Sequence, residues 1–174
     1  MSVELLDELD EWLDENEIEP RVVWSPRVKN KDVARAARAL GVRLPPSYVE
    51  LVTTRGTFFI DGDLTGRGSG NDTRLLTPSE IVEHTERYRG EAHEHDGPEQ
   101  QRILDDALIF CADPKGELFH LFVISSLDDA GEMATRPYDY QNLGMNDGWH
   151  EGDGSFASVI EGIVADVEEN LVED

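Results

Sequence analysis

The chain has 174 residues and a formal net charge of −23, with 38 acidic residues against 15 basic ones. This length is enough for one domain with its own hydrophobic core. Such an acidic surface disfavours nucleic acids and anionic membranes, since both are polyanions, and it favours basic proteins as partners. Solubility or adaptation to high salt explains the same total equally well, so the charge alone leaves these alternatives open.

The chain begins Met1-Ser2-Val3-Glu4, without the basic and apolar segments of a secretory signal. No apolar run approaches the roughly 20 residues that cross a bilayer. The single cysteine, Cys111, has no partner for an internal disulfide. Together these features predict a cytoplasmic protein.

Charge is unevenly distributed along the chain. Residues 1–20 carry nine acids and residues 137–174 carry ten, and neither segment holds a base, whereas residues 21–43 hold seven of the fifteen bases. We therefore expect acidic chain ends and a basic band in the first third.

Three helices are predicted in the first third of the chain. Residues 3–15 place leucines and a tryptophan on one helical stripe, and residues 31–40 do the same with smaller apolar side chains before a terminating glycine. Residues 22–24 are either a short strand or an extended linker. Tandem prolines at 45 and 46 open a short helix that ends at Gly56.

Strands and one further helix are predicted in the middle of the chain. Residues 57–60 and 74–76 are candidate strands on either side of a loop rich in glycine and aspartate. Thr77-Pro78-Ser79-Glu80 is a capping box, so a helix begins there and is expected to end near Gly90. Residues 91–102 are predicted to be irregular, with Pro98 able to open a short helical turn.

A hairpin and a last helix complete the prediction. Residues 108–112 and 118–125 form the two strands, and Asp113-Pro114-Lys115-Gly116 between them is typical of a type I turn. Residues 132–142 are a further candidate strand, and residues 155–171 form the last helix. Because strands and helices do not alternate strictly, we expect an α+β fold with a mixed, mostly antiparallel sheet flanked by helices.

The loop from Asp61 to Asp72 partly resembles a calcium loop. Asp61, Asp63 and Asp72 occupy positions 1, 3 and 12, and Gly66 occupies position 6. Position 8 is Gly68 where an apolar residue belongs, position 12 lacks the longer glutamate, and a strand rather than a helix precedes the loop. A surface loop is therefore the better interpretation.

Two further segments carry side chains that are common in catalytic and metal sites. His93 and His95 stand two residues apart, so they diverge on a helix or a strand, and no third ligand follows at a recognisable spacing. Cys111 lies in the most apolar strand, with His120 on its hairpin partner as the one available base. A solvated loop and an inert thiol are favoured, and no catalytic residue, metal or cofactor is predicted.

The ordered motifs resemble those of the SUKH superfamily. The run from Ala39 to Tyr48 resembles a helix ending in Leu-Gly, then Leu-Pro and a tyrosine, and Gly56 closes the short helix that follows. Residues 76–81 resemble the entry to the family's middle helix, residues 108–122 its central hairpin, and Ser155-Phe156 the start of its final helix. The sequence departs from the pattern at Thr54-Arg55, where the family more often has Asn before the glycine.

The resemblance covers roughly residues 31–171 of a single domain, residues 1–174, with residues 1–20 as an acidic helical extension. It implies an α+β fold and a protein-binding role without catalytic residues, since many bacterial members look like immunity proteins that neutralise a toxin, often a nuclease. Four residues that match its motif are read as framework. They are Leu44, Pro45, Tyr48 and Gly56.

The leading hypothesis is therefore a non-catalytic immunity protein that binds a basic, nuclease-type toxin, as a monomer or a weak homodimer. One alternative is a regulatory scaffold of the same fold, like the yeast cell-wall-synthesis regulators. Another is a metal-binding or enzymatic protein that uses residues 61–72 or 93–96. The candidate partner-binding residues are Asp61, Asp63, Asp72, Glu91, Glu94, Asp96, Tyr138, Asp139, Trp149 and Glu151.

Overall fold

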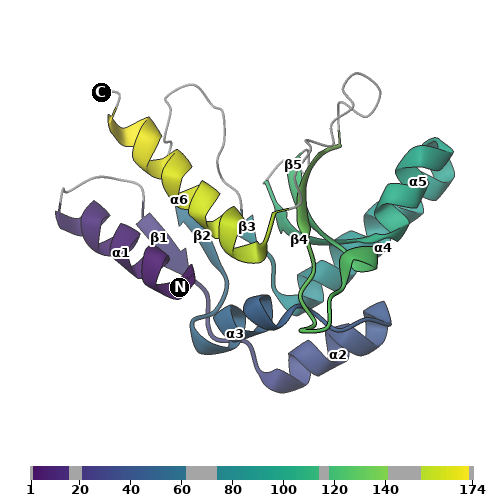
Figure 1. The fold of residues 1–174 in the computed structure, drawn as a ribbon, viewed down its shortest axis with the longest axis horizontal. Helices are drawn as coiled ribbons and strands as arrows, with labels where there is room; N and C mark the ends of the chain where they lie inside the picture. Colours follow the sequence, from purple (N-terminus) through teal and green to yellow (C-terminus); the bar gives the residue numbers. More distant parts are fainter. Residues whose placement is uncertain (1, 16–20, 62–73, 114–117, 141–153, 173–174) are drawn as a thin grey trace.

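The computed structural model describes residues 2–15, 21–61, 74–113, 118–140 and 154–172. Its helices are α1 (Ser2–Glu15), α2 (Asn30–Leu40), α3 (Pro46–Thr54), α4 (Pro78–His95), α5 (Pro98–Asp105) and α6 (Phe156–Val172). Its strands are β1 (Arg21–Trp24), β2 (Phe58–Asp61), β3 (Arg74–Leu75), β4 (Ala107–Ala112), β5 (Leu118–Val123) and β6 (Thr135–Asp139). The α+β class is thus confirmed, and Figure 1 shows the arrangement.

Two sheets are present in the described part of the chain, and all their pairings are antiparallel. One sheet pairs β1 with β2. The other has the order β3-β4-β5-β6, so the predicted hairpin forms its centre. A bulge between Ile109 and Cys111 shifts the register of that hairpin, and the Ile109 amide donates to the Thr85 hydroxyl of α4 at 3.0 Å. This buried bond ties the irregular strand to the helix that covers it.

The four-stranded sheet is covered on both faces. On one face, Tyr88 of α4 packs edge-on against Phe119 of β5, with ring centroids 4.6 Å apart. On the other face, Phe156 of α6 packs against Phe110 and Phe122 at 5.7 and 6.0 Å. Alternate residues of β5 therefore contribute to two layers of the core, as strand geometry requires.

The predicted framework residues are buried and hold α3 in place. Tyr48 is fully buried, and its hydroxyl donates to the Leu76 carbonyl at 2.7 Å. Gly56 has φ +111°, and a Cβ there would lie 2.1 Å from the Ser25 carbonyl oxygen. Leu44 and Pro45 are buried at the start of the same helix. The motif thus contributes packing, a buried hydrogen bond and a close backbone approach.

Two predicted element ends are wrong. The strand predicted over residues 118–125 ends at Val123, and a short 3-10 helix, Ile124–Ser126, follows it. The helix expected to end near Gly90 continues to His95, because the apolar stripe of α4 extends past the glycine to the buried Ala92. Gly90 stays helical, at the modest cost that glycine has inside a helix. Residues 98–105 form α5, a full short helix in a segment predicted to be mostly irregular.

Candidate functional site

The predicted partner-binding residues fall into two groups. Asp63, Asp72, Trp149 and Glu151 lie outside the described residues, as does the loop considered for calcium. Asp61 is the last residue of β2, where it stands opposite Arg21. The remaining candidates belong to α4, the α4–α5 junction and β6. They can form one surface only if these segments lie close together in the fold.

The end of α4 and the strand β6 do come together, although 40 residues separate them in sequence. Tyr140, just past β6, packs edge-on against Tyr88 of α4 at 5.1 Å, and its hydroxyl lies 3.5 Å from Glu91 Oε2. Glu91 also accepts from Arg87 Nε at 2.8 Å. We call this region the α4–β6 edge. Its residues are Arg87, Glu91, Glu94, Asp96, Tyr138, Asp139 and Tyr140.

The carboxylates of the α4–β6 edge act on its tyrosines. Burial, followed by the charges of Asp96 and Glu91, raises the pKa of Tyr140 to about 12. Burial also raises the pKa of Tyr138, with Asp96 as the next contribution. Both phenols are therefore neutral at physiological pH, and the region presents acceptor oxygens beside aromatic rings. Glu94, in contrast, is exposed at the helix end.

The strand β6 offers only part of its outer edge for pairing with another chain. The amide and carbonyl of Thr135 bond to Gly154 at 2.7 and 3.0 Å, so the backbone groups of residues 135, 137 and 139 point outward. Pro137 has no amide hydrogen to donate at its outward position. The bonded Thr135 and the missing donor at Pro137 therefore make this edge a poor template for an added strand.

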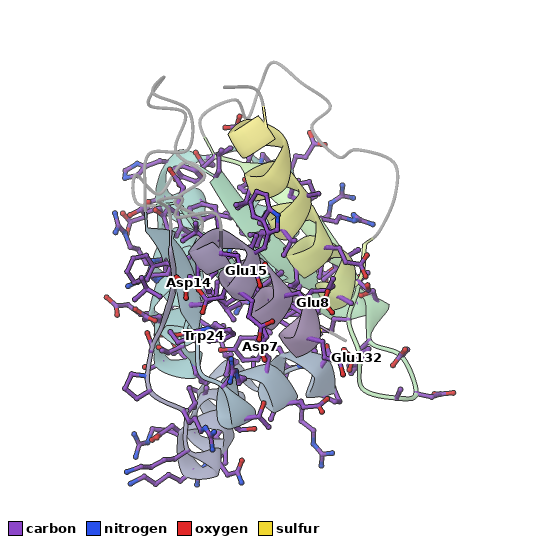
Figure 2. The ribbon with its side chains drawn as sticks, turned by 90° about the vertical axis from the view of Figure 1, so that its left-hand side faces the viewer. Asp7, Glu8, Asp14, Glu15, Trp24 and Glu132 are labelled. Atoms are coloured by element: carbon purple, nitrogen blue, oxygen red, sulfur yellow. The ribbon has the colours of Figure 1, made fainter. Side chains whose placement is uncertain are left out.

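A second acidic surface is the outer side of α1. Leu6, Leu9 and Leu13 are buried against the core, which leaves the acidic residues of the helix outside. We call the five exposed ones the α1 face, and α1 contains no basic residue. They are Glu4, Glu8, Glu11, Asp14 and Glu15. Figure 2 shows this face beside Trp24 of β1.

The α1 face opposes the ordinary stability rules for helices. Glu4, Glu8, Glu11 and Glu15 recur at intervals of four, three and four residues, so like charges adjoin along one side. Glu15 lies at the negative end of the helix dipole, and the last turn of α1 holds no basic residue. Helix stability therefore does not account for Glu8, Glu11 and Glu15.

An arginine outside α1 links the helix to the rest of the molecule. Arg55, at the end of α3, forms an ion pair with Asp7, and its guanidinium lies 5.1 Å from the centroid of the Trp24 ring. The Trp24 ring in turn packs against Phe58 at 5.4 Å. Trp24, Arg55 and Asp7 were not among the predicted site residues, because their contacts join three separate segments. The signal was present in Arg55 itself, at the position where the chain departs from the family pattern.

The candidates for catalysis lack the required chemistry. Cys111 is fully buried, and burial raises the pKa of its thiol, so the thiolate nucleophile does not form at neutral pH. His120 stands opposite Cys111 in the hairpin, and burial lowers its pKa to about 4. His93 binds Asp105 of α5 at 2.9 Å. Within the described segments no group of three or more potential ligands is placed to hold a metal ion.

Glu132 has a structural role that the sequence analysis missed. Its carboxylate accepts from the Ser47 amide at 2.8 Å and from the Ser47 hydroxyl at 2.6 Å, which caps the first turn of α3 from 85 residues away. Asp128 holds the loop by accepting from the amides of Ala130 and Glu132. An acid from a distant loop replaces the local cap that Pro45 cannot supply.

Comparison with known families assigns the chain. Residues 27–151 match the sequence profile of the SMI1 / KNR4 family (SUKH-1), which covers more than half of the chain. No curated protein matches the sequence significantly. None of the helices in the described ranges is both long and apolar enough to cross a membrane. The framework around Tyr48 and Gly56 agrees with this match, and the chain belongs to the SMI1 / KNR4 family (SUKH-1).

Proposed function

We propose that this chain is a non-catalytic immunity protein that binds and neutralises a basic toxin domain, of the nuclease type. Membership in the SUKH-1 family supports this proposal, because many bacterial members of the superfamily look like immunity proteins. The buried thiol of Cys111 and the low pKa of His120 support a binding role over nucleophilic catalysis. The proposal also takes the protein to be cytoplasmic.

The observation that carries the proposal is the α1 face. Glu8, Glu11 and Glu15 are exposed and bind no other residue in the described part of the chain. Exposed glutamates on α4, such as Glu83 and Glu86, also form no ion pair in the described segments, but α4 carries basic residues among its acids whereas α1 carries none. A nuclease surface that binds a polyanion is basic, so its lysines and arginines complement a row of free carboxylates and speed the encounter.

The α4–β6 edge is the second surface that a cationic partner fits. Lysine and arginine side chains bind carboxylates and also pack on aromatic rings. Tyr140 and Glu91 offer both groups within 3.5 Å of each other. We place the partner's main contact on the α1 face. The interface extends to the α4–β6 edge and to the predicted residues outside the described ranges.

Co-purification with the product of the neighbouring gene tests the proposal. The tagged chain is isolated from cells at low salt, and the bound protein is identified and eluted with a sodium chloride gradient. The proposal predicts a basic partner whose affinity falls as salt screens the carboxylates. Loss of that partner's toxicity in the presence of the chain supports immunity. A stable complex with a non-toxic regulator would instead support the scaffold alternative, and an affinity independent of salt would contradict the electrostatic contact.

A further inference from the structure

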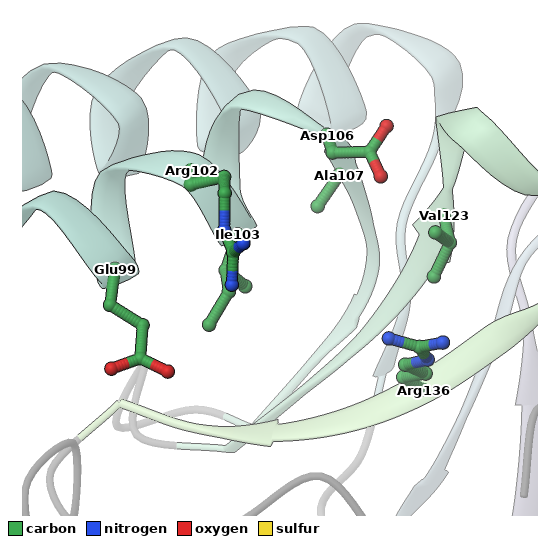
Figure 3. A pocket seen from close by; sticks show the side chains of 7 residues that line it. All are labelled: Glu99, Arg102, Ile103, Asp106, Ala107, Val123 and Arg136. Carbon is green, nitrogen blue, oxygen red and sulfur yellow. The ribbon is translucent and has the colours of Figure 1, made fainter.

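A hollow of about 330 Å³ lies between α5 and the edge of the four-stranded sheet. Glu99, Arg102 and Ile103 of α5 line one side, and Arg136 of β6 lies across from them, as Figure 3 shows. The volume is at the small end of the range for pockets that bind small molecules. Neither the α1 face nor the α4–β6 edge contributes a side chain to this hollow.

Two residues of opposite charge lie at the hollow without forming an ion pair with each other. Glu99 and Arg102 are three residues apart on α5, which places their side chains side by side. Neither side chain makes a hydrogen bond or an ion pair with any residue in the described segments. This differs from Arg35 and Arg87, which pair with acids at similar spacing on their own helices. Glu99 and Arg102 are therefore available to a ligand.

The other polar groups of the hollow are arranged differently. Asp106 accepts from the Ser125 amide at 2.8 Å and also from the Ser125 hydroxyl, so its carboxylate is already engaged. Arg136 lies on the opposite wall, and it too already interacts within the protein. The hollow thus offers one free carboxylate and one free guanidinium, Glu99 and Arg102, on the same wall.

The remaining lining is aliphatic. Ala107 and Val123 are buried, with 2% and 8% of their surfaces exposed, and Ile103 is partly buried beside them. These three side chains form an apolar surface between the charged groups. A ligand that fills the hollow therefore needs an aliphatic body as well as charged groups.

We infer that the hollow binds a free α-amino acid with an aliphatic side chain. The ligand's carboxylate pairs with Arg102, its ammonium pairs with Glu99, and its side chain covers Ala107 and Val123. A zwitterion fits better than a simple anion, because a net charge of −23 repels anions but exerts no net force on a neutral molecule. This site is independent of the proposed toxin-binding surface.

NMR titration of the full chain with L-leucine tests the inference. Saturable shifts of the backbone amide signals of Ile103, Ala107 and Val123 are expected, with a dissociation constant on the order of 1 mM for so small a ligand. Three analogues remove one group each: 4-methylpentanoate lacks the ammonium, 3-methylbutylamine lacks the carboxylate, and glycine lacks the aliphatic body. Each is expected to bind about tenfold more weakly, as the loss of one such contact implies.

Variants in the hollow separate a built site from loose association. Arg102→Gln and Glu99→Gln are each expected to weaken leucine binding about tenfold, because each removes one charged contact. The control Arg35→Gln removes an exposed arginine of α2 and is expected to leave binding unchanged. Absence of saturable shifts with leucine overturns the inference. Equal binding of leucine and 4-methylpentanoate, or equal weakening by the control, overturns it as well.

Discussion

Tyr48 is fully buried and donates its hydroxyl to the Leu76 carbonyl, whereas Glu8 and Glu11 face solvent without a partner in the described part of the chain. Around Tyr48, packing and hydrogen bonding both stabilise the fold, so folding stability accounts for the residues of this region. On the α1 face, like charges adjoin and oppose the helix dipole, so stability is no explanation. The contrast distinguishes the framework that defines the fold from the surface on which we place function.

The largest effect is expected from Gly56→Ala in the framework. The new Cβ meets the Ser25 carbonyl at 2.1 Å, and φ +111° strains any residue with a side chain, so the free energy of unfolding should fall by at least about 3 kcal/mol. Urea denaturation measures the change. Gly41→Ala is the matched control, because φ is +71° there but no atom lies within 4 Å, and it should cost about 1–2 kcal/mol. Equal costs would mean that the close approach is not essential.

His120 gives the buried region a pH dependence. Burial lowers its pKa to about 4 from an ordinary value of 6.5, so the unfolded chain binds the proton more readily than the folded one. Stability from this group is complete above pH 6.5 and is lost as the pH falls toward 4, by about 3 kcal/mol in all. Denaturant unfolding at pH 7 and pH 4.5 should show a smaller acid loss in His120→Gln than in the wild type. The same loss in both proteins would contradict this assignment.

Tyr48→Phe removes a single hydroxyl from the framework. The Leu76 carbonyl is then left without this donor in a buried position, which should lower the free energy of unfolding by about 1–3 kcal/mol. Tyr140→Phe is the control at the α4–β6 edge, where the hydroxyl lies at the longer distance of 3.5 Å from Glu91. Thermal and urea unfolding of the two variants should therefore differ. A larger loss of unfolding free energy in Tyr140→Phe than in Tyr48→Phe would contradict the assignment of the Tyr48 region to stability.

The smallest effect, and the opposite sign, is expected on the α1 face. Glu8→Gln with Glu11→Gln removes like-charge neighbours, so the free energy of unfolding should rise by about 0.5 kcal/mol at low salt. In 1 M sodium chloride this gain in stability should disappear, because the Debye length is then about 3 Å and the repulsion between the carboxylates is screened. A loss of stability in this double variant would show that these carboxylates serve the fold, and the contrast with the framework would fail.

Sequence patterns predicted the local elements well, because periodicity, capping boxes and prolines act within one segment. The capping box at Thr77 is present, with Thr77 accepting from the Glu80 amide, and Gly41 ends α2 with φ +71°. The end of α4 was misplaced because the buried Ala92 extends the helix beyond Gly90. That outcome depends on tertiary packing, which a local signal does not contain.

The candidate sites were less predictable because they join distant segments. Contact between Glu91 and Tyr140 depends on where β6 lies relative to α4, and the cap that Glu132 gives to Ser47 spans 85 residues. The hollow beside Arg102 likewise combines α5 with β6. The acidic N-terminal segment was nevertheless predicted, because the number of charges in a segment can be read from the sequence without knowing the fold.

The central claim is that the α1 face contacts a basic partner, and charge reversal tests it most directly. Calorimetric titration of the purified partner would compare the wild type with Glu8→Lys/Glu11→Lys and with Glu83→Lys/Glu86→Lys. The second pair is also exposed and three residues apart, but on α4, so both variants change the net charge equally. The account predicts at least a tenfold loss of affinity for the α1 variant alone, about 1.4 kcal/mol. Equal losses in the two variants would contradict it.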